Sequence, residues 1–259
     1  MTSSLLVLIG LAVGSFVNVV IMRLPQGRSF IGGRSHCMHC KHTLAWYDLI
    51  PLVSYLIQKG KCRYCSKSVS WQYPFVEAYS AFAVVFSYYL LADGGLIFWI
   101  WSVFLLEMFL IIAVIDIKHL IIPDGILISI LIVSIGLSFF ANKLSFESLF
   151  GLDNLLSALV LMAVFFAIWF FSRGLWLGFG DVKLAGVIGF VLGYPDSVIA
   201  VYLGIILGFL IGIILLIFRQ AGMKTKMPLG TFLAAAVSAY LLFGLWIEPF
   251  VLKYLTFLV

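Results

Sequence analysis

The stretch best suited to chemistry is Gly178-Phe179-Gly180-Asp181-Val182-Lys183, which stands between long apolar runs. A carboxylate at the edge of a hydrocarbon slab is costly unless it has a partner, faces water or performs a reaction. Gly178 and Gly180 remove side chains, so another backbone can come close to Asp181. The pattern favours a functional carboxylate, with Lys183 and the two glycines as supporting residues. The alternative is a helix start, where an acidic side chain meets the positive end of the helix dipole.

A second carboxylate, Asp116, follows the apolar run 96–115. Two carboxylates held close together cannot both ionise cheaply, so one of them keeps a proton. The ionised one can take a proton from water as that water attacks an amide carbonyl, and the protonated one can donate to the carbonyl oxygen. Asp116 and Asp181 together therefore predict an aspartyl protease site. Asp124 is the rival of Asp116 and a supporting residue of the site, although Pro123 and Asp124 also suit a first helical turn.

All four cysteines lie in one loop, as Cys37-Met38-His39-Cys40 and Cys62-Arg63-Tyr64-Cys65, with 21 residues between the pairs. Two such knuckles predict a zinc ion bound by four thiolates. Because four thiolates fill the tetrahedron, the zinc is expected to be structural. A loop of about 50 residues buries too little apolar surface to fold firmly alone, and zinc can supply that stability. A redox pair and a site that has lost its metal are the alternatives.

Other polar and small residues within the apolar runs predict contacts between helices. Gly10 and Gly14 have the small-xxx-small spacing of close helix packing. Asn18 lies in the same run and is expected to form an interhelical hydrogen bond. Glu107 lies half a turn away from the Asp116 face, so we expect it to bond to a neighbouring helix.

The elements that position these residues are membrane helices. Of the 259 residues, 64% are hydrophobic and 10% are charged, against roughly 25% charged in soluble domains. The first run is expected to be a span and not a cleaved signal peptide. Apolar runs occupy residues 4–22, 73–91, 96–115, 124–140, 155–171, 181–192, 197–218 and 229–247. The sequence thus predicts an all-α polytopic protein with about eight transmembrane helices.

The sixth run is the exception to this regularity. It has about 12 residues, whereas the other seven have about 17 to 22, and a crossing needs roughly 20. It is either a half-span or begins earlier, within 174–180. Seven spans, or a re-entrant sixth segment, are therefore the alternatives to eight full crossings.

Lys and Arg predict the orientation of the spans. Eight of the sixteen lie in the loop 23–72, and with eight alternating spans fourteen fall on that side. This places the loop and both aspartates on the cytoplasmic side and both termini outside. The predicted parts are a first helix (1–22), a cytoplasmic zinc-binding domain (23–72) and a transmembrane protease domain (73–259). The formal charge of +5 then needs no nucleic-acid partner.

Four motifs in this order resemble the type IV prepilin peptidase family, bacterial inner-membrane leader peptidases with a G-x-G-D active site. They are Gly14-Ser15-Phe16 with Asn18 and Arg23-Leu24-Pro25, the paired C-x-x-C loop, Asp116 with Ile122-Pro123-Asp124, and the stretch 178–184. The segments 50–55 and 73–77, on either side of the second knuckle, resemble that family too. The resemblance runs from about residue 10 to residue 190.

The resemblance implies that Asp116 and Asp181 are catalytic. The implied substrate is the short basic leader of a prepilin or pseudopilin, cut after a glycine on the cytoplasmic face just before its apolar helix. Many members also methylate the new N-terminus with S-adenosylmethionine. No Gly-rich nucleotide-binding pattern is visible in this sequence, so no methyl-donor residues are assigned. The expected surroundings are the bilayer of the bacterial inner membrane.

Two other classes of membrane protein use similar residues. A thiol-disulfide oxidoreductase would use the C-x-x-C pairs, but such pairs usually lie on the outer face or in a span. A transporter would use Asp116 and Asp181 as proton or cation sites, but its acidic residues tend to lie near mid-membrane. The protease interpretation explains both aspartates, their shared face and the zinc loop.

Overall fold

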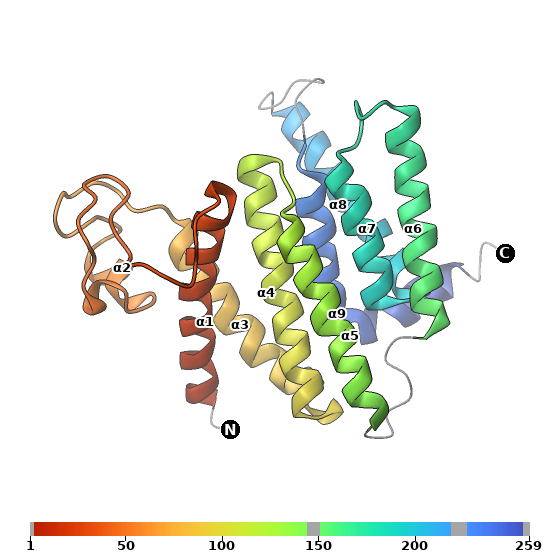
Figure 1. Ribbon diagram of the computed structural model, residues 1–259, viewed down its shortest axis with the longest axis horizontal. Helices are drawn as coiled ribbons and strands as arrows, with labels where there is room; N and C mark the ends of the chain where they lie inside the picture. The colour runs from red at the N-terminus through yellow and green to blue at the C-terminus, as the bar shows by residue number, and fades with distance from the viewer. Residues whose placement is uncertain (1–2, 144–150, 219–226, 256–259) are drawn as a thin grey trace. The chain divides into compact units, whose positions relative to one another are not determined.

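The structure is a computed structural model that describes residues 3–143, 151–218 and 227–255 (Figure 1). Within these ranges the regular structure is helical, and the strand-like pairings are two isolated bridges. The longer helices are α1 (Ser3–Arg23), α3 (Gln72–Leu91), α4 (Leu96–His119), α5 (Asp124–Lys143), α6 (Leu152–Phe171), α7 (Phe179–Leu192), α8 (Asp196–Ile217) and α9 (Leu229–Leu255). Shorter elements are η1 (Leu24–Gln26), η2 (Trp46–Asp48), α2 (Val53–Ile57) and η3 (Ala92–Gly94).

Each predicted apolar run forms one of the longer helices. Five of them (α1, α3, α4, α6 and α8) are apolar and long enough to cross a membrane, which confirms an all-helical membrane protein. Helix α7 begins at Phe179, before the predicted run, and its 14 residues span about 21 Å, less than a hydrocarbon core of about 30 Å. The number of eight crossings therefore stays a prediction. Arg219, Lys224 and Lys226, which the charge count used, lie outside the described residues.

The first compact unit, Met1–Glu107, is built on the packing of α1 against α3. A Cβ atom on Gly10 would lie 2.5 Å from the Ala81 Cα, and one on Gly14 would lie 2.7 Å from the Glu77 Cα. Larger residues would therefore force the two helices apart. The predicted small-residue contact is confirmed, with α3 as the partner of α1.

The two polar side chains that were predicted to bond between helices, Asn18 and Glu107, do so in this unit. The Asn18 side chain donates to the Tyr73 carbonyl and accepts from the Gln72 amide, each over 3.1 Å. Glu107 accepts a hydrogen bond from the Ser80 hydroxyl of α3 over 2.8 Å. These three hydrogen bonds satisfy the Asn18 amide and one oxygen of Glu107, whereas the buried Oε1 of Glu107 has no hydrogen-bond partner among the described residues.

The second compact unit, Met108–Val259, is organised around the short helix α7. This helix contacts α5, α6, α8 and α9, and most of its side chains are buried. Figure 1 shows α7 beside α6, and a Cβ on Gly189 would lie 2.6 Å from the Ala158 Cα of α6. The close approach at Gly189 therefore sets how α7, and with it Asp181, sits against α6.

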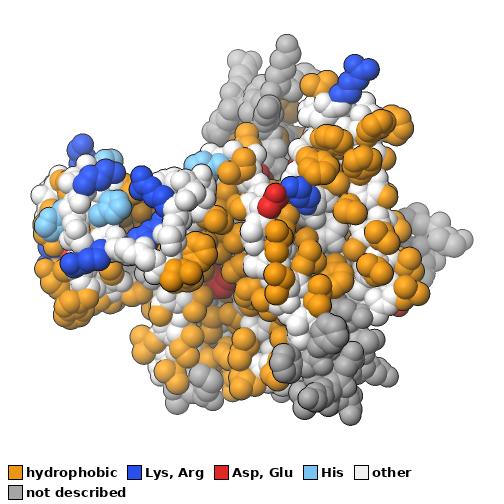
Figure 2. Space-filling model, in the orientation of Figure 1, with side chains coloured by type: hydrophobic (Ala, Val, Ile, Leu, Met, Phe, Trp, Pro, Cys, Tyr) orange, Lys and Arg blue, Asp and Glu red, His pale blue; other side chains and the backbone are white. Residues whose placement is uncertain are grey.

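Basic side chains concentrate on the loop between α1 and α3, which also exposes apolar residues such as Trp46, Leu56 and Ile57 (Figure 2). Figure 2 shows Lys, Arg and His side chains gathered on the loop between α1 and α3, whereas hydrophobic side chains cover much of the helices. Exposed apolar residues on α6 and α8 include Val160, Phe170, Phe209 and Ile217. Apolar surface of this extent on single helices is what contact with lipid requires.

The packing at Gly189 yields a prediction. Gly189→Ala places a methyl group against the α6 backbone, so we expect a destabilisation of about 1–3 kcal/mol, seen as a lower melting temperature in detergent. Gly136→Ala on α5 is the matched control, because a Cβ there meets nothing within 4 Å. Equal melting temperatures for the two variants would contradict the close packing of α6 and α7.

Candidate active site and metal centre

Asp116 lies in the last turn of α4, with only 5% of its surface exposed. Its Oδ2 accepts a hydrogen bond from the backbone N–H of Thr231 over 2.7 Å and a second from the Thr231 hydroxyl over 3.1 Å. Thr231 is the third residue of α9, where N–H groups have no partner within the helix; its N–H also makes a longer contact of 3.2 Å with the carbonyl of Pro228, just before the helix. The α9 N-terminus thus supplies the donors that a buried carboxylate needs.

Asp181 lies in the first turn of α7 and is partly buried. Its Oδ2 accepts the backbone N–H of Gly178 over 3.1 Å, which is a helix-capping contact. Asp116 acts electrostatically against the ionisation of Asp181, and the backbone N–H of Gly230 favours it. Asp181 therefore starts a helix and also faces the second carboxylate, so the two interpretations of this residue are compatible.

The glycines of the site make room for one apolar side chain. A Cβ on Gly180 would lie 3.2 Å from the Ile122 Cβ, and a Cβ on Gly230 would lie 2.8 Å from the Ile122 Cδ1. The same atom on Gly230 would lie 3.0 Å from Oδ2 of Asp116. The segment after α4, which carries Ile122, therefore fills the space that Gly180 leaves. Gly178, by contrast, donates its backbone N–H to the carboxylate of Asp181.

Asp124 and Lys183 form an ion pair between α5 and α7. The Lys183 Nζ donates to Oδ1 of Asp124 over 2.7 Å, and both side chains are exposed in substantial part. Asp124 is the first residue of α5, so it also has the helix-start position that the sequence suggested. An exposed pair of this kind contributes at most about 1 kcal/mol to stability. The ion pair between Asp124 and Lys183 links α5 to α7. Among the hydrogen bonds of the described residues, none joins either side chain of this pair to the carboxylate of Asp181.

The residues that sequence analysis missed come from the start of the last helix. Gly230 and Thr231 provide adjacent backbone N–H groups, one directed to each aspartate. The signal was present in Pro228-Leu229-Gly230-Thr231, because Pro, Gly and Thr gather where helices begin. Nothing in that pattern indicates which distant side chains the helix start will meet.

The four cysteines form a second candidate site, in the loop of the first unit. Their Sγ atoms all lie within 4.8 Å of one another, and the Cys37 and Cys65 sulfurs are 3.9 Å apart. A tetrahedral zinc with bonds of about 2.3 Å has sulfurs separated by about 3.8 Å, whereas a disulfide is about 2.05 Å long. The four thiols therefore fit a zinc ion, and they do not form a disulfide.

Both knuckles have the same backbone geometry. The N–H of the first cysteine bonds to the carbonyl five residues later, at His42 and at Lys67, and the residue after the second cysteine has positive φ. These residues are Lys41 with φ 59° and Ser66 with φ 57°. The tight turn points both thiols of a pair, and nearby backbone N–H groups, to one centre. Such repetition is typical of a metal knuckle, and the sequence spacing alone predicted it.

The surroundings of the four cysteines change the pKa values of two of their thiols. Burial opposes the ionisation of Cys37, but the N–H groups of Cys40 and His39 and the adjacent thiols lower its pKa to about 7. The Lys67 N–H favours the Cys65 thiolate, yet burial and the three other thiols raise the pKa of Cys65 to about 11. The Cys37 thiol therefore ionises more readily than the Cys65 thiol, and a bound cation would favour the thiolate form of its ligands.

Asp48 holds the two halves of the loop together. Its carboxylate accepts hydrogen bonds from the Tyr64 hydroxyl over 3.0 Å and the Ala45 N–H over 3.2 Å, and it pairs with the Arg63 guanidinium over 3.1 Å. Tyr64 and Arg63 belong to the second knuckle, whereas Ala45 follows the first. The hydrogen bond with Tyr47, followed by the hydrogen bond to Asp48, raises the pKa of the Tyr64 hydroxyl. Sequence analysis did not single out Asp48.

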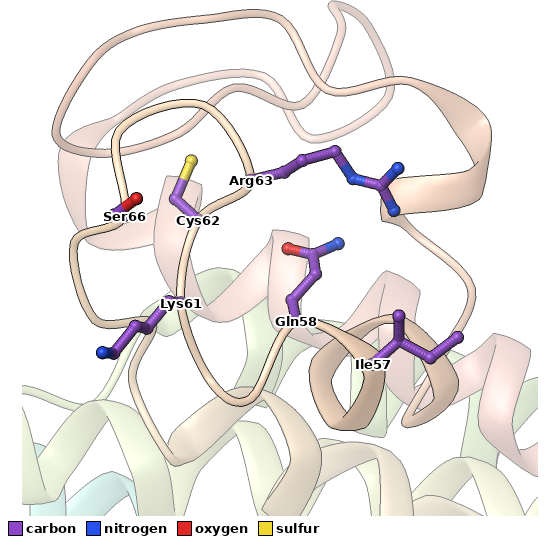
Figure 3. A pocket seen from close by; sticks show the side chains of 6 residues that line it. All are labelled: Ile57, Gln58, Lys61, Cys62, Arg63 and Ser66. Atoms are coloured by element: carbon purple, nitrogen blue, oxygen red, sulfur yellow. The ribbon is translucent and has the colours of Figure 1, made fainter.

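An open hollow of about 410 Å³ lies beside the second knuckle. It is lined by Ile57, Gln58, Lys61, Cys62, Arg63 and Ser66 (Figure 3). Figure 3 shows Lys61 and Arg63 on opposite sides of this hollow. Because its polar groups do not converge on one point, the hollow lacks the arrangement of a catalytic pocket.

Two family models match the chain. Residues 8–91 match the bacterial peptidase A24 N-terminal domain, and residues 103–213 match the type IV leader peptidase family. The second match contains both Asp116 and Asp181. No solved structure matches the chain significantly.

Curated proteins similar to the chain include two named prepilin leader peptidase/N-methyltransferase. The protein of Bacillus subtilis is 32% identical over 96% of this chain and 98% of its own length. That of Pseudomonas aeruginosa is 30% identical over 92% of this chain and 89% of its own length. The type 4 prepilin-like proteins leader peptide-processing enzyme of Escherichia coli is 39% identical over 44% of this chain and 49% of its own length. The similarity to the first protein covers nearly the whole of both chains, so this chain belongs to the type IV prepilin peptidase family.

Proposed function

We propose that this chain is a membrane-embedded aspartic endopeptidase with Asp116 and Asp181 as its catalytic pair. Its substrates would be type IV prepilins or pseudopilins, and it would remove their basic leader after a glycine at the cytoplasmic face. The names of the relatives support this substrate class. One observation carries the catalytic assignment: Thr231 in the α9 first turn binds Asp116, and Ile122 lies against both Gly230, the neighbour of Thr231, and Gly180, the neighbour of Asp181.

This geometry suits the hydrolysis of an amide. The ionised carboxylate takes a proton from water as the water oxygen bonds to the scissile carbonyl carbon. The protonated carboxyl gives its proton to the carbonyl oxygen, so the tetrahedral intermediate forms without a free oxyanion. When the C–N bond breaks, the leaving amine takes up the proton gained by the first carboxylate. The second carboxylate recovers its proton from the hydroxyl of the intermediate, and the pair returns to its starting state.

Electrostatic repulsion between the two carboxylates favours a state in which one of them keeps a proton. Two carboxylates in mutual range, with one of them almost wholly buried, disfavour double ionisation. The N–H donors of Gly230 and Thr231 stabilise the single negative charge that remains. An oxidoreductase function leaves the carboxylate pair unexplained, and a transporter function leaves the grouping of the four cysteines unexplained.

We propose that residues 23–72 form a structural zinc domain between a first membrane helix, 1–22, and a membrane protease region, 73–259. Cys37, Cys40, Cys62 and Cys65 would hold the ion, which would stabilise the loop and take no part in hydrolysis. Glu77 of α3 accepts the Leu52 N–H over 2.8 Å, so the folded loop is fastened to a membrane helix. The positive charge of the loop supports a cytoplasmic position for the loop and the active site, with both termini outside.

The names of the relatives also include N-methyltransferase, and we propose methylation of the new N-terminus as a second activity. S-adenosylmethionine would supply the methyl group. Among the described residues, the hollow beside Cys62 does not suit this cationic sulfonium, because Lys61 and Arg63 line it. No residue of the chain is therefore assigned to the methyl donor.

Replacing either aspartate removes an acid–base group without removing volume. We expect Asp116→Asn and Asp181→Asn each to lower the rate of prepilin cleavage in membranes by at least about 100- to 10,000-fold. Asp153→Asn, an exposed aspartate in the first turn of α6, is the matched control and should cleave normally. Normal cleavage by either test variant, at equal protein level, would refute the assignment of that residue.

Metal analysis tests the cysteine site. The purified chain should hold about one zinc, in accord with a single four-thiolate site, and the Cys37→Ser/Cys40→Ser variant should lose it. His39→Ala should retain zinc, because His39 is exposed and lies between the two ligands of the first knuckle. Metal-free protein with full activity and an unchanged melting temperature would contradict a stabilising zinc.

The mass of the mature N-terminus tests the second activity. After cleavage in the presence of S-adenosylmethionine, we expect the product to be about 14 Da heavier than the unmodified peptide, the mass of one added CH₂ group. Omitting the methyl donor should leave cleavage intact and remove the increment. Cleavage that never yields the heavier product would retain the peptidase and exclude the methyl transfer.

A further inference from the structure

The Thr231 side chain is enclosed between two acceptors of α4. Its Oγ lies 3.1 Å from Oδ2 of Asp116 and 3.1 Å from the carbonyl oxygen of Ala113, one turn earlier in the same helix. Thr231 is 7% exposed, so little solvent competes for these contacts. A hydroxyl carries one proton, and it can donate that proton to only one of the two acceptors at a time.

This arrangement lets the hydroxyl respond to the charge on Asp116. When the carboxylate is ionised, the stronger acceptor is Oδ2, and the hydroxyl donates to it. When Asp116 is neutral, the hydroxyl can rotate and donate to the Ala113 carbonyl. The Thr231 N–H donates to Oδ2 over 2.7 Å, and it can remain a donor to that oxygen when Oδ2 is the carbonyl oxygen of the neutral acid. Rotation about a single C–O bond thus accommodates a proton transfer without moving the helices.

Both hydrogen bonds from Thr231 end on the same oxygen of Asp116. Since Oδ2 is held by two donors, neither of these bonds occupies Oδ1, which is left to exchange protons with water or substrate. The N–H of the adjacent residue, Gly230, favours the ionised form of Asp181, and Gly230 has no side chain to displace the carboxylate of Asp116. Two consecutive residues of α9 therefore act on the two aspartates, Thr231 on Asp116 and Gly230 on Asp181.

We propose that Thr231 and Gly230 are the positioning residues of the catalytic pair, an inference that rests on the proposed protease function. Thr231 fixes Oδ2 of Asp116 and stabilises its ionised form, so that Oδ1 acts on the attacking water. Gly230 holds the carboxylate of Asp181 within range of Asp116. Both residues lie beyond the segment 103–213 that the family model matches.

The test is the steady-state kinetics of the full-length enzyme on a prepilin in detergent micelles, measured across pH. Thr231→Val keeps the shape and the N–H but removes the hydroxyl. Loss of one hydrogen bond to a charged group should lower kcat about 10- to 100-fold, with KM unchanged. The acidic limb of the pH profile should move to higher pH, because the ionised Asp116 has lost a donor.

Two further variants separate positioning from general stability. Thr231→Ser keeps both donors and should restore kcat and the pH profile. Ser238→Ala is the control on the same helix: Ser238 is also 7% exposed, but its hydroxyl bonds to the carbonyl of Ala234 in its own helix. It should leave kcat and the pH profile unchanged.

Thr231→Val with wild-type kcat and pH profile would overturn the proposal, as would a defect that Thr231→Ser fails to repair. If the Thr231→Val protein does not accumulate in the membrane, the Gly230→Ala variant tests the positioning role in its place. The methyl group of this variant would lie 3.0 Å from Oδ2 of Asp116. A lower kcat at unchanged KM supports positioning, whereas a wild-type rate refutes it. A fully active Asp116→Asn would instead refute the proposed protease function itself.

Discussion

A carboxylate surrounded by apolar helices must be supplied with hydrogen-bond donors, and this requirement governs the second unit. A buried ionised group without partners costs several kcal/mol. Asp116 sits at the end of a largely apolar helix, and its donors come from Thr231, 115 residues away in sequence. Helix termini are the source of spare N–H groups in a helical protein. The α9 start therefore lies where the carboxylates need it, and the α4, α7 and α9 ends meet at one place.

The short helix α7 carries the second carboxylate in its first turn. It is surrounded by α5, α6, α8 and α9, and eight of its residues from Val182 to Val191 are buried. Small residues permit this enclosure, since Gly189 meets the α6 backbone and Gly180 meets Ile122. A buried, short helix thus presents a carboxylate at its open end while its apolar body anchors it.

Local patterns predicted much of this structure. Hydrophobic run lengths predicted one helix for each run, and the cysteine spacing predicted four thiols that gather within metal-binding distance. Asn18 and Glu107 form the expected interhelical bonds, because an isolated polar residue in an apolar run has few alternatives. The contacts of Thr231, Gly230 and Asp48 were not predictable, because each depends on how distant segments pack. Sequence can indicate that a carboxylate needs donors, but tertiary structure decides which N–H groups provide them.

The central claim is that Asp116 and Asp181 work as one unit that shares a proton. The most direct measurement is kcat/KM for prepilin cleavage by the unmodified enzyme over a wide pH range. A shared proton predicts a bell-shaped profile, since activity needs one ionised and one protonated carboxyl and is lost when both are protonated or both are ionised. A rate that rises with pH to a plateau and stays there, with no alkaline limb, would contradict the account.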